Sequence, residues 1–132
     1  MLQGGEPMKF FLNLFKKKQV VSVTPMPSWE AVVEMMHDKY LDAFSDEVIQ
    51  VIYSKDRSMR YVVLKNEESL LTYQLEAIYQ YDEDEWRYIC SDNDALPAMW
   101  EPYKGIYRKS LFKNRDDLLK EMKCEPEYLL YF

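Results

Sequence analysis

Apolar and polar residues repeat with two different periods along this chain, first the period of a helix and then that of a β-strand. In residues 29–44 (WEAVVEMMHDKYLDAF) the apolar positions recur every three or four residues. Ser28 precedes this stretch and offers a side-chain oxygen as an N-cap, and Glu30 suits the positive end of a helix dipole. The pattern predicts a helix with one buried stripe, formed by Trp29, Val32, Val33, Met36 and Tyr40.

From residue 46 onward apolar residues alternate with polar ones, which is typical of strands. EVIQVIYS (47–54) and MRYVVLKN (59–66) flank the polar turn KDRS and predict a hairpin. SLLTYQLEAIYQYD (69–82) predicts a third strand that is half-solvated. Its expected apolar face consists of Leu71, Tyr73, Leu75, Ala77, Tyr79 and Tyr81, and its expected polar face of Thr72, Gln74, Glu76 and Gln80.

The next segment predicts a turn and a fourth strand. DEDE (82–85) provides the polar turn, and WRYICS (86–91) returns with Trp86, Tyr88 and Cys90 on a single face. Pro97 and Pro102 lie within the following stretch, DNDALPAMWEPYKG, and favour a loop over residues 92–105, after which IYRKSLF (106–112) can add a short fifth strand.

The C-terminal residues predict a second helix and an apolar tail. Asn114 resembles an N-cap with Asp117 three residues later, and RDDLLKEMKC (115–124) places acids at its start and lysines near its end. Pro126 prevents this helix from continuing. The tail EYLLYF (127–132) is then expected to pack as a strand or an extended segment.

These elements predict an α+β fold: an N-terminal helix, a four- to five-stranded antiparallel meander, and a C-terminal helix and apolar tail packed on one sheet face. Both helices are expected to cover the apolar face of the sheet. The proline-stiffened TPMPS (24–28) separates a basic N-terminal arm, residues 1–24, from a single α+β domain, residues 25–132.

Composition and charge narrow the possible functions. Apolar residues form 48% of the 132 residues and there are only three glycines, which argues against disorder and against a glycine-rich phosphate loop. The net charge is −6, and four lysines against one glutamate give the arm +3, so the remainder carries −9. An acidic body repels phosphate backbones and attracts a basic protein partner, so direct nucleic-acid binding is not expected.

The arm MKFFLNLFKKK is too short and too polar to predict a signal peptide or stable membrane insertion. We therefore expect a cytoplasmic protein with reduced Cys90 and Cys124. The arm itself is expected to be a mobile or docked segment, with weak contact to an anionic membrane as the alternative.

Candidate catalytic and metal-ligating groups are few. His37 is the only histidine, and a nucleophilic scheme would have to pair it with Cys90 or Cys124, although neither cysteine has a recognisable motif around it. The acids from Asp82 to Asp94 lack the alternating oxygens and the glycine of a calcium loop, so no metal site is predicted. A structural role is expected for His37, and no cofactor is implied.

The densest cluster of charge is the candidate contact surface for a partner. The acids of residues 82–94 either form a binding surface for a cationic protein or belong to ordinary solvated loops. Trp100 either plugs the end of the core, which its size favours, or stands exposed as an anchor. The candidate partner-binding residues are Asp82, Glu83, Asp84, Glu85, Asp92, Asp94, Trp100 and Tyr103.

Three stretches carry a resemblance: MKFFLNLFKKK, RYVVLKNEESLLTYQLEAIYQYDEDEWRYI and LFKNRDDLLKEMKCEPEYLLYF. From about Trp29 to Phe132 the chain resembles small bacterial proteins, some of which are immunity proteins that neutralise secreted polymorphic toxins. The resemblance implies an acidic, cytoplasmic, non-catalytic binder that covers a toxin. It assigns no role to individual residues.

The sequence thus favours a non-enzymatic acidic protein-binding module, with an immunity protein as the particular case. Two alternatives stay open. One is a small enzyme that uses His37 with a cysteine or carboxylates. The other is a phage or plasmid inhibitor whose acidic face mimics nucleic acid.

Overall fold

The computed structural model describes residues 24–91, 94–107 and 110–132. The predicted basic arm, apart from Thr24, lies outside these residues. The described chain divides into two compact units. The larger comprises the described residues of Pro27–Glu83 and Leu96–Phe132, and the smaller contains Asp84–Ala95 and the residues up to Met26.

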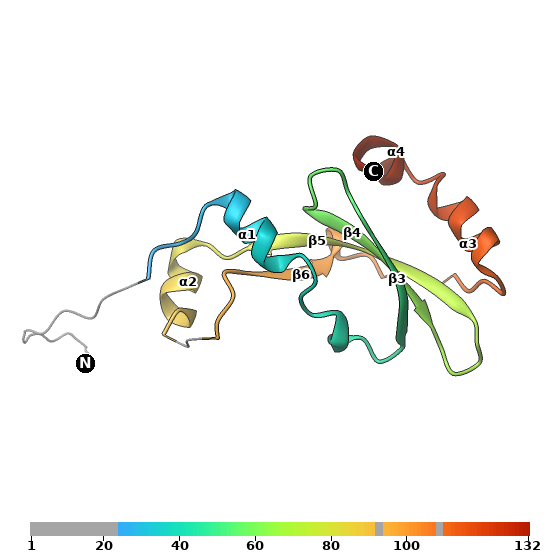
Figure 1. Ribbon diagram of the computed structural model, residues 1–132, viewed down its shortest axis with the longest axis horizontal. Helices are drawn as coiled ribbons and strands as arrows, with labels where there is room; N and C mark the ends of the chain where they lie inside the picture. The colour runs from blue at the N-terminus through green and yellow to red at the C-terminus, as the bar shows by residue number, and fades with distance from the viewer. Residues whose placement is uncertain (1–23, 92–93, 108–109) are drawn as a thin grey trace, which may run out of the picture. The chain divides into compact units, whose positions relative to one another are not determined.

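A four-stranded antiparallel sheet in the order β3-β4-β5-β6 organises the larger unit (Figure 1). The strands are β3 (Glu47–Tyr53), β4 (Met59–Lys65), β5 (Leu71–Gln80) and β6 (Ala98–Pro102). Each strand pairs with the next one in sequence, as a meander requires. The predicted hairpin and the predicted third strand are confirmed, and so is the α+β class.

The hairpin of β4 and β5 shows how local sequence sets the register. In the turn between β4 and β5, the Asn66 side chain accepts hydrogen bonds from the backbone N–H groups of Glu68 and Leu70. Ser69 adopts a left-handed backbone with φ of 65°. A short turn that ends in a left-handed residue is a common hairpin connection, and here it pairs Lys65 with Leu71 and Arg60 with Glu76.

Helix α1 (Trp29–Met36) is shorter than the sequence predicts. Ser28 caps it as expected, because its Oγ accepts a hydrogen bond from the Ala31 N–H at 3.2 Å. The chain then turns, and Tyr40 takes a left-handed conformation (φ 65°) ahead of the 3₁₀ helix η1 (Leu41–Ala43). Val32, Val33 and Met36 are buried as predicted, whereas the two ends of the predicted stripe, Trp29 and Tyr40, are exposed.

The two predicted helices pack on opposite faces of the sheet, which corrects the expectation that both cover the same face. Helix α3 (Arg115–Met122) buries Leu118 and Met122 against one face. These two side chains pack with Tyr61 of β4 and with Tyr73 and Leu75 of β5, which alternate along their strand and so share one face. On the other face, Val32 and Met36 of α1 pack with Ala98 and Trp100 of β6.

Because of α1, the supposedly solvated face of β5 is largely covered. Gln74 and Glu76 are both buried, although the alternation of the sequence predicts them on the water side. Alternation reports only that two faces differ in polarity. Here the polar face of β5 lies on the side where α1 and β6 form a second core, so its polar side chains need protein partners.

Residues 86–91 do not form the predicted fourth strand, and residues 82–85 are not simply a turn. Glu83–Ile89 form helix α2, with Trp86 buried and its indole N–H donating to the Thr24 carbonyl at 2.8 Å. A run of six residues is too short for its period to separate a strand from a helix. The acids at its start are the overlooked signal, since negative charge favours a helix N-terminus.

The fourth strand is β6 instead, within the predicted loop. Its residues alternate between buried and exposed positions, with Ala98 and Trp100 buried. β6 lies at the edge of the sheet, where proline is tolerated at a strand end. Two flanking prolines therefore did not exclude a strand.

The chain after β6 also differs from the predictions. Tyr103–Gly105 form the 3₁₀ helix η2, and the predicted strand over residues 106–112 reduces, in its described part, to a single bridge between Leu71 and Phe112. Asn114 caps α3 as predicted, accepting from the Asp117 N–H at 2.9 Å. The tail is helix α4 (Pro126–Tyr131) rather than a strand, because proline at the first helical position favours helix initiation.

Candidate functional site

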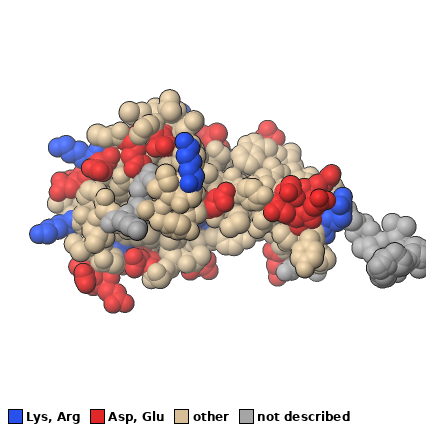
Figure 2. Space-filling view, turned by 180° about the vertical axis from the view of Figure 1, so that it is seen from behind, with Lys and Arg blue, Asp and Glu red and all other residues tan. Residues whose placement is uncertain are grey.

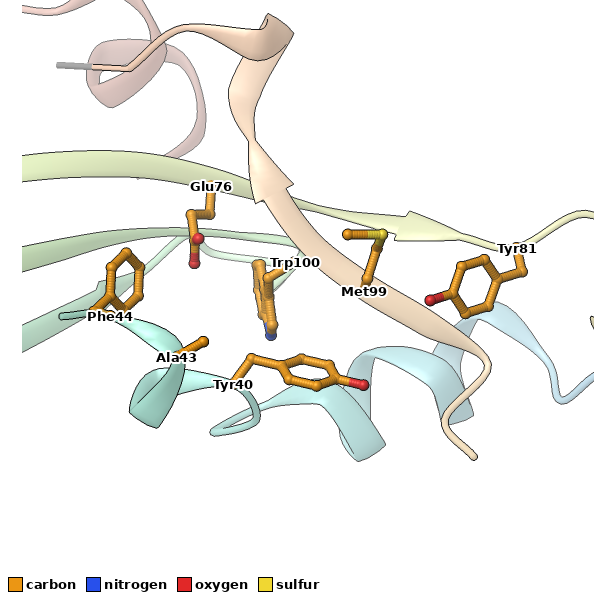
Figure 3. A pocket seen from close by; sticks show the side chains of 7 residues that line it. All are labelled: Tyr40, Ala43, Phe44, Glu76, Tyr81, Met99 and Trp100. Atoms are coloured by element: carbon orange, nitrogen blue, oxygen red, sulfur yellow. The ribbon is translucent and has the colours of Figure 1, made fainter. Parts of the chain in front are cut away.

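The larger unit contains a pocket of about 340 Å³ beside the end of β6. Its walls are mainly aromatic, and one carboxylate lies among them (Figure 3). The pocket combines residues far apart in the sequence because the turn after α1, strand β5 and strand β6 meet there. The lining residues are Tyr40, Ala43, Phe44, Glu76, Tyr81, Met99 and Trp100.

The short helix α1 and the left-handed turn after it position one wall. A continuous helix through residue 44 would project Tyr40 and Phe44 from a different axis. The reversal at Tyr40 and the turn of η1 instead bring Tyr40, Ala43 and Phe44 to the pocket. Tyr40 remains 42% exposed, so this wall is open to solvent.

Trp100 is fixed in orientation on the opposite wall. Its indole N–H donates to the Met36 carbonyl at 2.7 Å, which also satisfies an acceptor at the C-terminal end of α1. The prediction that Trp100 plugs a core is therefore confirmed, although the residue lies in a strand and not in a loop. Its ring is contacted by a cation, because the Arg60 guanidinium carbon lies 4.1 Å from the ring centroid.

Glu76 and Arg60 form a buried ion pair next to the pocket. Arg60 Nε donates to Glu76 Oε1 at 2.8 Å, and the two residues are directly opposite each other in the β4–β5 register. Figure 3 shows the Glu76 carboxylate directed toward the space between Phe44 and Trp100. The Arg60 side chain is completely buried, and among the described residues its Nη1 and Nη2 atoms have no hydrogen-bond partner.

Burial raises the pKa of the Glu76 carboxyl above its ordinary value, and the charge and hydrogen bond of Arg60 oppose this shift without cancelling it. Arg60 thus offsets only part of what the carboxylate loses by its removal from water. An open aromatic pocket next to such a carboxylate is suited to binding a group that carries positive charge and donates hydrogen bonds.

The side chain of His37 packs against an aromatic residue. Its ring stacks on Tyr53 with centroids 4.2 Å apart, and its backbone carbonyl accepts a hydrogen bond from the Tyr53 hydroxyl. Its Nδ1 is buried without a hydrogen-bond partner in the described chain. The sheet separates His37, at the end of α1, from Cys124, which follows α3 on the opposite face.

The structure offers no metal centre among the residues it describes. Within residues 24–91, 94–107 and 110–132, no group of three or more His, Cys, Asp or Glu side chains is arranged to hold a metal ion. Both cysteines are free thiols, with Cys124 exposed and Cys90 half-buried.

The predicted contact residues are distributed over several elements. Asp82, Glu83 and Asp84 are exposed at the start of α2, Glu85 is half-buried within it, and Asp94 is exposed after it. Asp92 lies outside the described residues.

Trp100 and Tyr103 belong to different cores. Trp100 packs with α1, whereas Tyr103 packs against the cluster on the α3 face. The structure therefore brings Trp100 together with Glu76, Tyr40 and Phe44 and not with Tyr103.

Sequence reasoning missed Glu76, Arg60, Tyr40 and Phe44. A signal for the first two was present: the turn over residues 66–70 fixes a register in which Arg60 faces Glu76, and opposite charges on neighbouring strands commonly pair. No sequence signal places Tyr40 and Phe44 beside them, because their position depends on where α1 ends.

No protein family model matches the chain, and no curated protein or solved structure matches it either. None of the described helices combines the length and apolar character needed to cross a membrane.

Proposed function

We propose that this chain is a non-enzymatic module that binds a basic protein partner through an acidic surface. The observation that supports it is the exposed cluster of carboxylates at the start of α2, including Glu83 and Asp84. Figure 2 shows Asp and Glu side chains gathered there. Such a cluster raises the encounter rate with a cationic surface and discriminates against acidic ones.

An exposed aromatic residue lies within the same helix. Tyr88 is 88% exposed, and it follows Asp84 by four residues, so the two side chains share a helix face. Tyrosine is among the residues that contribute most to binding energy when an interface buries them. In this proposal the acids provide steering, and Tyr88 provides the apolar contact that the buried Trp100 cannot.

The resemblance to immunity proteins makes a secreted toxin the first class of partner to test. An inhibitor of this kind needs a preformed surface that matches its target and no chemistry of its own. The net charge of −6 is compatible with a basic target.

The partner is sought by tagging the full chain and recovering bound proteins from its own cell lysate at low and at moderate salt. A single stoichiometric basic partner that is lost as salt rises is the expected result. Recovery of no partner at either salt would contradict the proposal.

Charge reversal then tests the surface itself. With Glu83→Lys and Asp84→Lys combined, we expect the association rate at low salt to fall about tenfold or more and its salt dependence to weaken. The matched control is Glu67→Lys with Glu68→Lys, which makes the same charge change at exposed positions in the β4–β5 turn. Equal effects of the two variants would show that only total charge matters and would reject α2 as the contact surface.

A further inference from the structure

The pocket beside Trp100 has the composition of a site for an organic cation. Three aromatic residues, Tyr40, Phe44 and Tyr81, accompany Trp100 in its walls. The faces of aromatic rings carry negative electrostatic potential and attract ammonium groups, most strongly where water is partly excluded. Figure 3 shows the Glu76 carboxylate flanked by Phe44 and Trp100, with Tyr40 below Trp100 and Tyr81 farther away, beyond Met99.

Glu76 retains the capacity to accept another hydrogen bond. Among the described residues, Arg60 is the one group that hydrogen-bonds this carboxylate, and it does so at Oε1. Glu76 also lines the pocket, so a donor that enters it can reach a carboxylate oxygen that Arg60 does not use. The raised pKa of this carboxyl indicates that Arg60 compensates its burial only in part.

Arg60 does not fill the cation site. Its guanidinium carbon lies over the Trp100 ring, so its charge is shared between that ring and Glu76. It is fully buried, and it is not among the residues that line the pocket. A second cation placed in the pocket would meet the carboxylate and the other aromatic rings.

We propose that this pocket receives the side-chain ammonium of a lysine from a basic protein partner. This inference rests on the proposed function, because it names the group that the acidic module recognises. The cation lies against Tyr40, Phe44 and Trp100 and donates a hydrogen bond to Glu76.

Lysine fits better than arginine for two reasons. A guanidinium binds a carboxylate best through two parallel hydrogen bonds, whereas one Glu76 oxygen is already engaged by Arg60. An ammonium is a compact charge that needs a single acceptor, and its four-carbon stem can cover apolar surface such as Met99. The volume of about 340 Å³ is at the lower end of the ~300–1,000 Å³ typical of ligand sites.

The first experiment titrates the full chain with n-butylammonium, which reproduces the lysine stem and head, and with n-butanol as the neutral analogue. The readout is the indole N–H resonance of Trp100 in a two-dimensional NMR spectrum. We expect saturable binding of butylammonium in the millimolar range, as suits so small a ligand. Butanol should bind at least about tenfold more weakly, since it lacks the charge. Equal binding of the two probes would overturn the proposal.

Two variants test the residues. Tyr40→Asn removes one aromatic wall, and asparagine tolerates the left-handed backbone at this position. We expect about fivefold weaker binding of butylammonium. Tyr107→Asn is the matched control, because Tyr107 is exposed and does not line the pocket. Glu76→Gln keeps an acceptor for Arg60 and removes the negative charge, and it should weaken binding further. Unchanged affinity in Tyr40→Asn would overturn the proposal even if Glu76→Gln does not fold.

The partner assay separates this inference from the proposed function. A partner whose affinity falls in Tyr40→Asn but not in Tyr107→Asn supports both. If a partner binds Tyr40→Asn with unchanged affinity, the proposed function stands and the lysine pocket is rejected. If butylammonium binds selectively but no protein partner is recovered, the pocket is still a cation site. The proposed function is then rejected, and so is a partner lysine as the occupant of the pocket.

Discussion

At the scale of single residues, two kinds of feature affect the stability of this protein: left-handed backbone conformations and shifted pKa values. Ser69 and Tyr40 hold left-handed conformations that disfavour residues with a Cβ atom. Glu76 and Asp56 are carboxyls whose pKa values shift in opposite directions. Each of these features predicts whether a given substitution raises or lowers the free energy of unfolding.

Ser69→Gly should stabilise the protein. Ser69 is exposed and has φ of 65°, which glycine adopts without steric cost. Part of the gain is offset by the greater freedom of glycine in the unfolded chain, so we expect an increase of about 0.5–1 kcal/mol in the free energy of unfolding. Urea denaturation measures it. Glu67→Gly, at an exposed neighbour outside the left-handed region, is the control and should be destabilising.

The pH dependence of stability should carry opposite contributions from Glu76 and Asp56. Desolvation raises the pKa of Glu76 in the folded state, so the stability that this group contributes is present below its unfolded pKa and is lost as the pH rises through the folded one. The pKa of Asp56 is lowered, first by the hydrogen bond from the Ser58 backbone N–H. Its contribution is therefore present above its ordinary value of 3.8 and is lost as the pH falls through the folded value.

Urea denaturation at several pH values tests these signs in two variants. The stability of the wild type relative to Glu76→Gln should decrease as the pH rises above about 4.5, since the carboxyl then loses its proton more readily in the unfolded state than in the folded state. Relative to Asp56→Asn, it should decrease as the pH falls below about 4. Parallel pH profiles of the wild type and Glu76→Gln would show that burial does not shift this carboxyl.

Among the elements, those with local signals were predictable. The caps at Ser28 and Asn114, the hairpin of β3 and β4, and the long strand β5 follow from short-range rules and are confirmed. The α2 segment was misread because Trp86, Ile89 and Cys90 also fit a helical period, and tertiary context decided between the two. Helix α4 was misread because Pro126 ends one helix and begins the next.

Helix α4 should depend on one carboxylate for its docking. The hydroxyls of Tyr61 and Tyr73 donate to the two oxygens of Glu125, the N-cap residue of α4, at 2.8 and 2.7 Å. Glu125→Ala removes the acceptor for both, and we expect a loss of about 2–3 kcal/mol in the free energy of unfolding. Hydrogen exchange should show α4 amides losing protection before those of β4. Glu121→Ala, at an exposed position on α3, is the control, and an equal effect there would contradict this role of Glu125.

For the larger unit as a whole, the central property is a sheet with a separate core on each face. Leu118 and Leu75 belong to the core on the α3 side, whereas Val32 belongs to the core on the α1 side. Substitutions in contact within one core are expected to couple energetically, but substitutions on opposite faces share no packing partners.

A pair of double-mutant cycles tests this division. Leu118→Ala should cost about 2–5 kcal/mol by itself, because it leaves a cavity in a fully buried site. Combined with Val32→Ala, its effect should add to within about 0.5 kcal/mol, whereas the combination with Leu75→Ala should depart from additivity by more than that. Strong coupling between Val32 and Leu118 would indicate that the two cores act as one.

The sequence by itself determined the α+β class, the meander, the helix caps and the acidic character, because turns, caps and alternation are short-range properties. Only the tertiary structure decided that α1 and α3 take opposite faces, that β6 lies in the proline-bounded segment, and that Glu76 is buried beside Trp100. Alternation gives the two faces of a strand but not what covers each one. The candidate pocket belongs to this second group, since it exists only where the end of α1 meets β5 and β6.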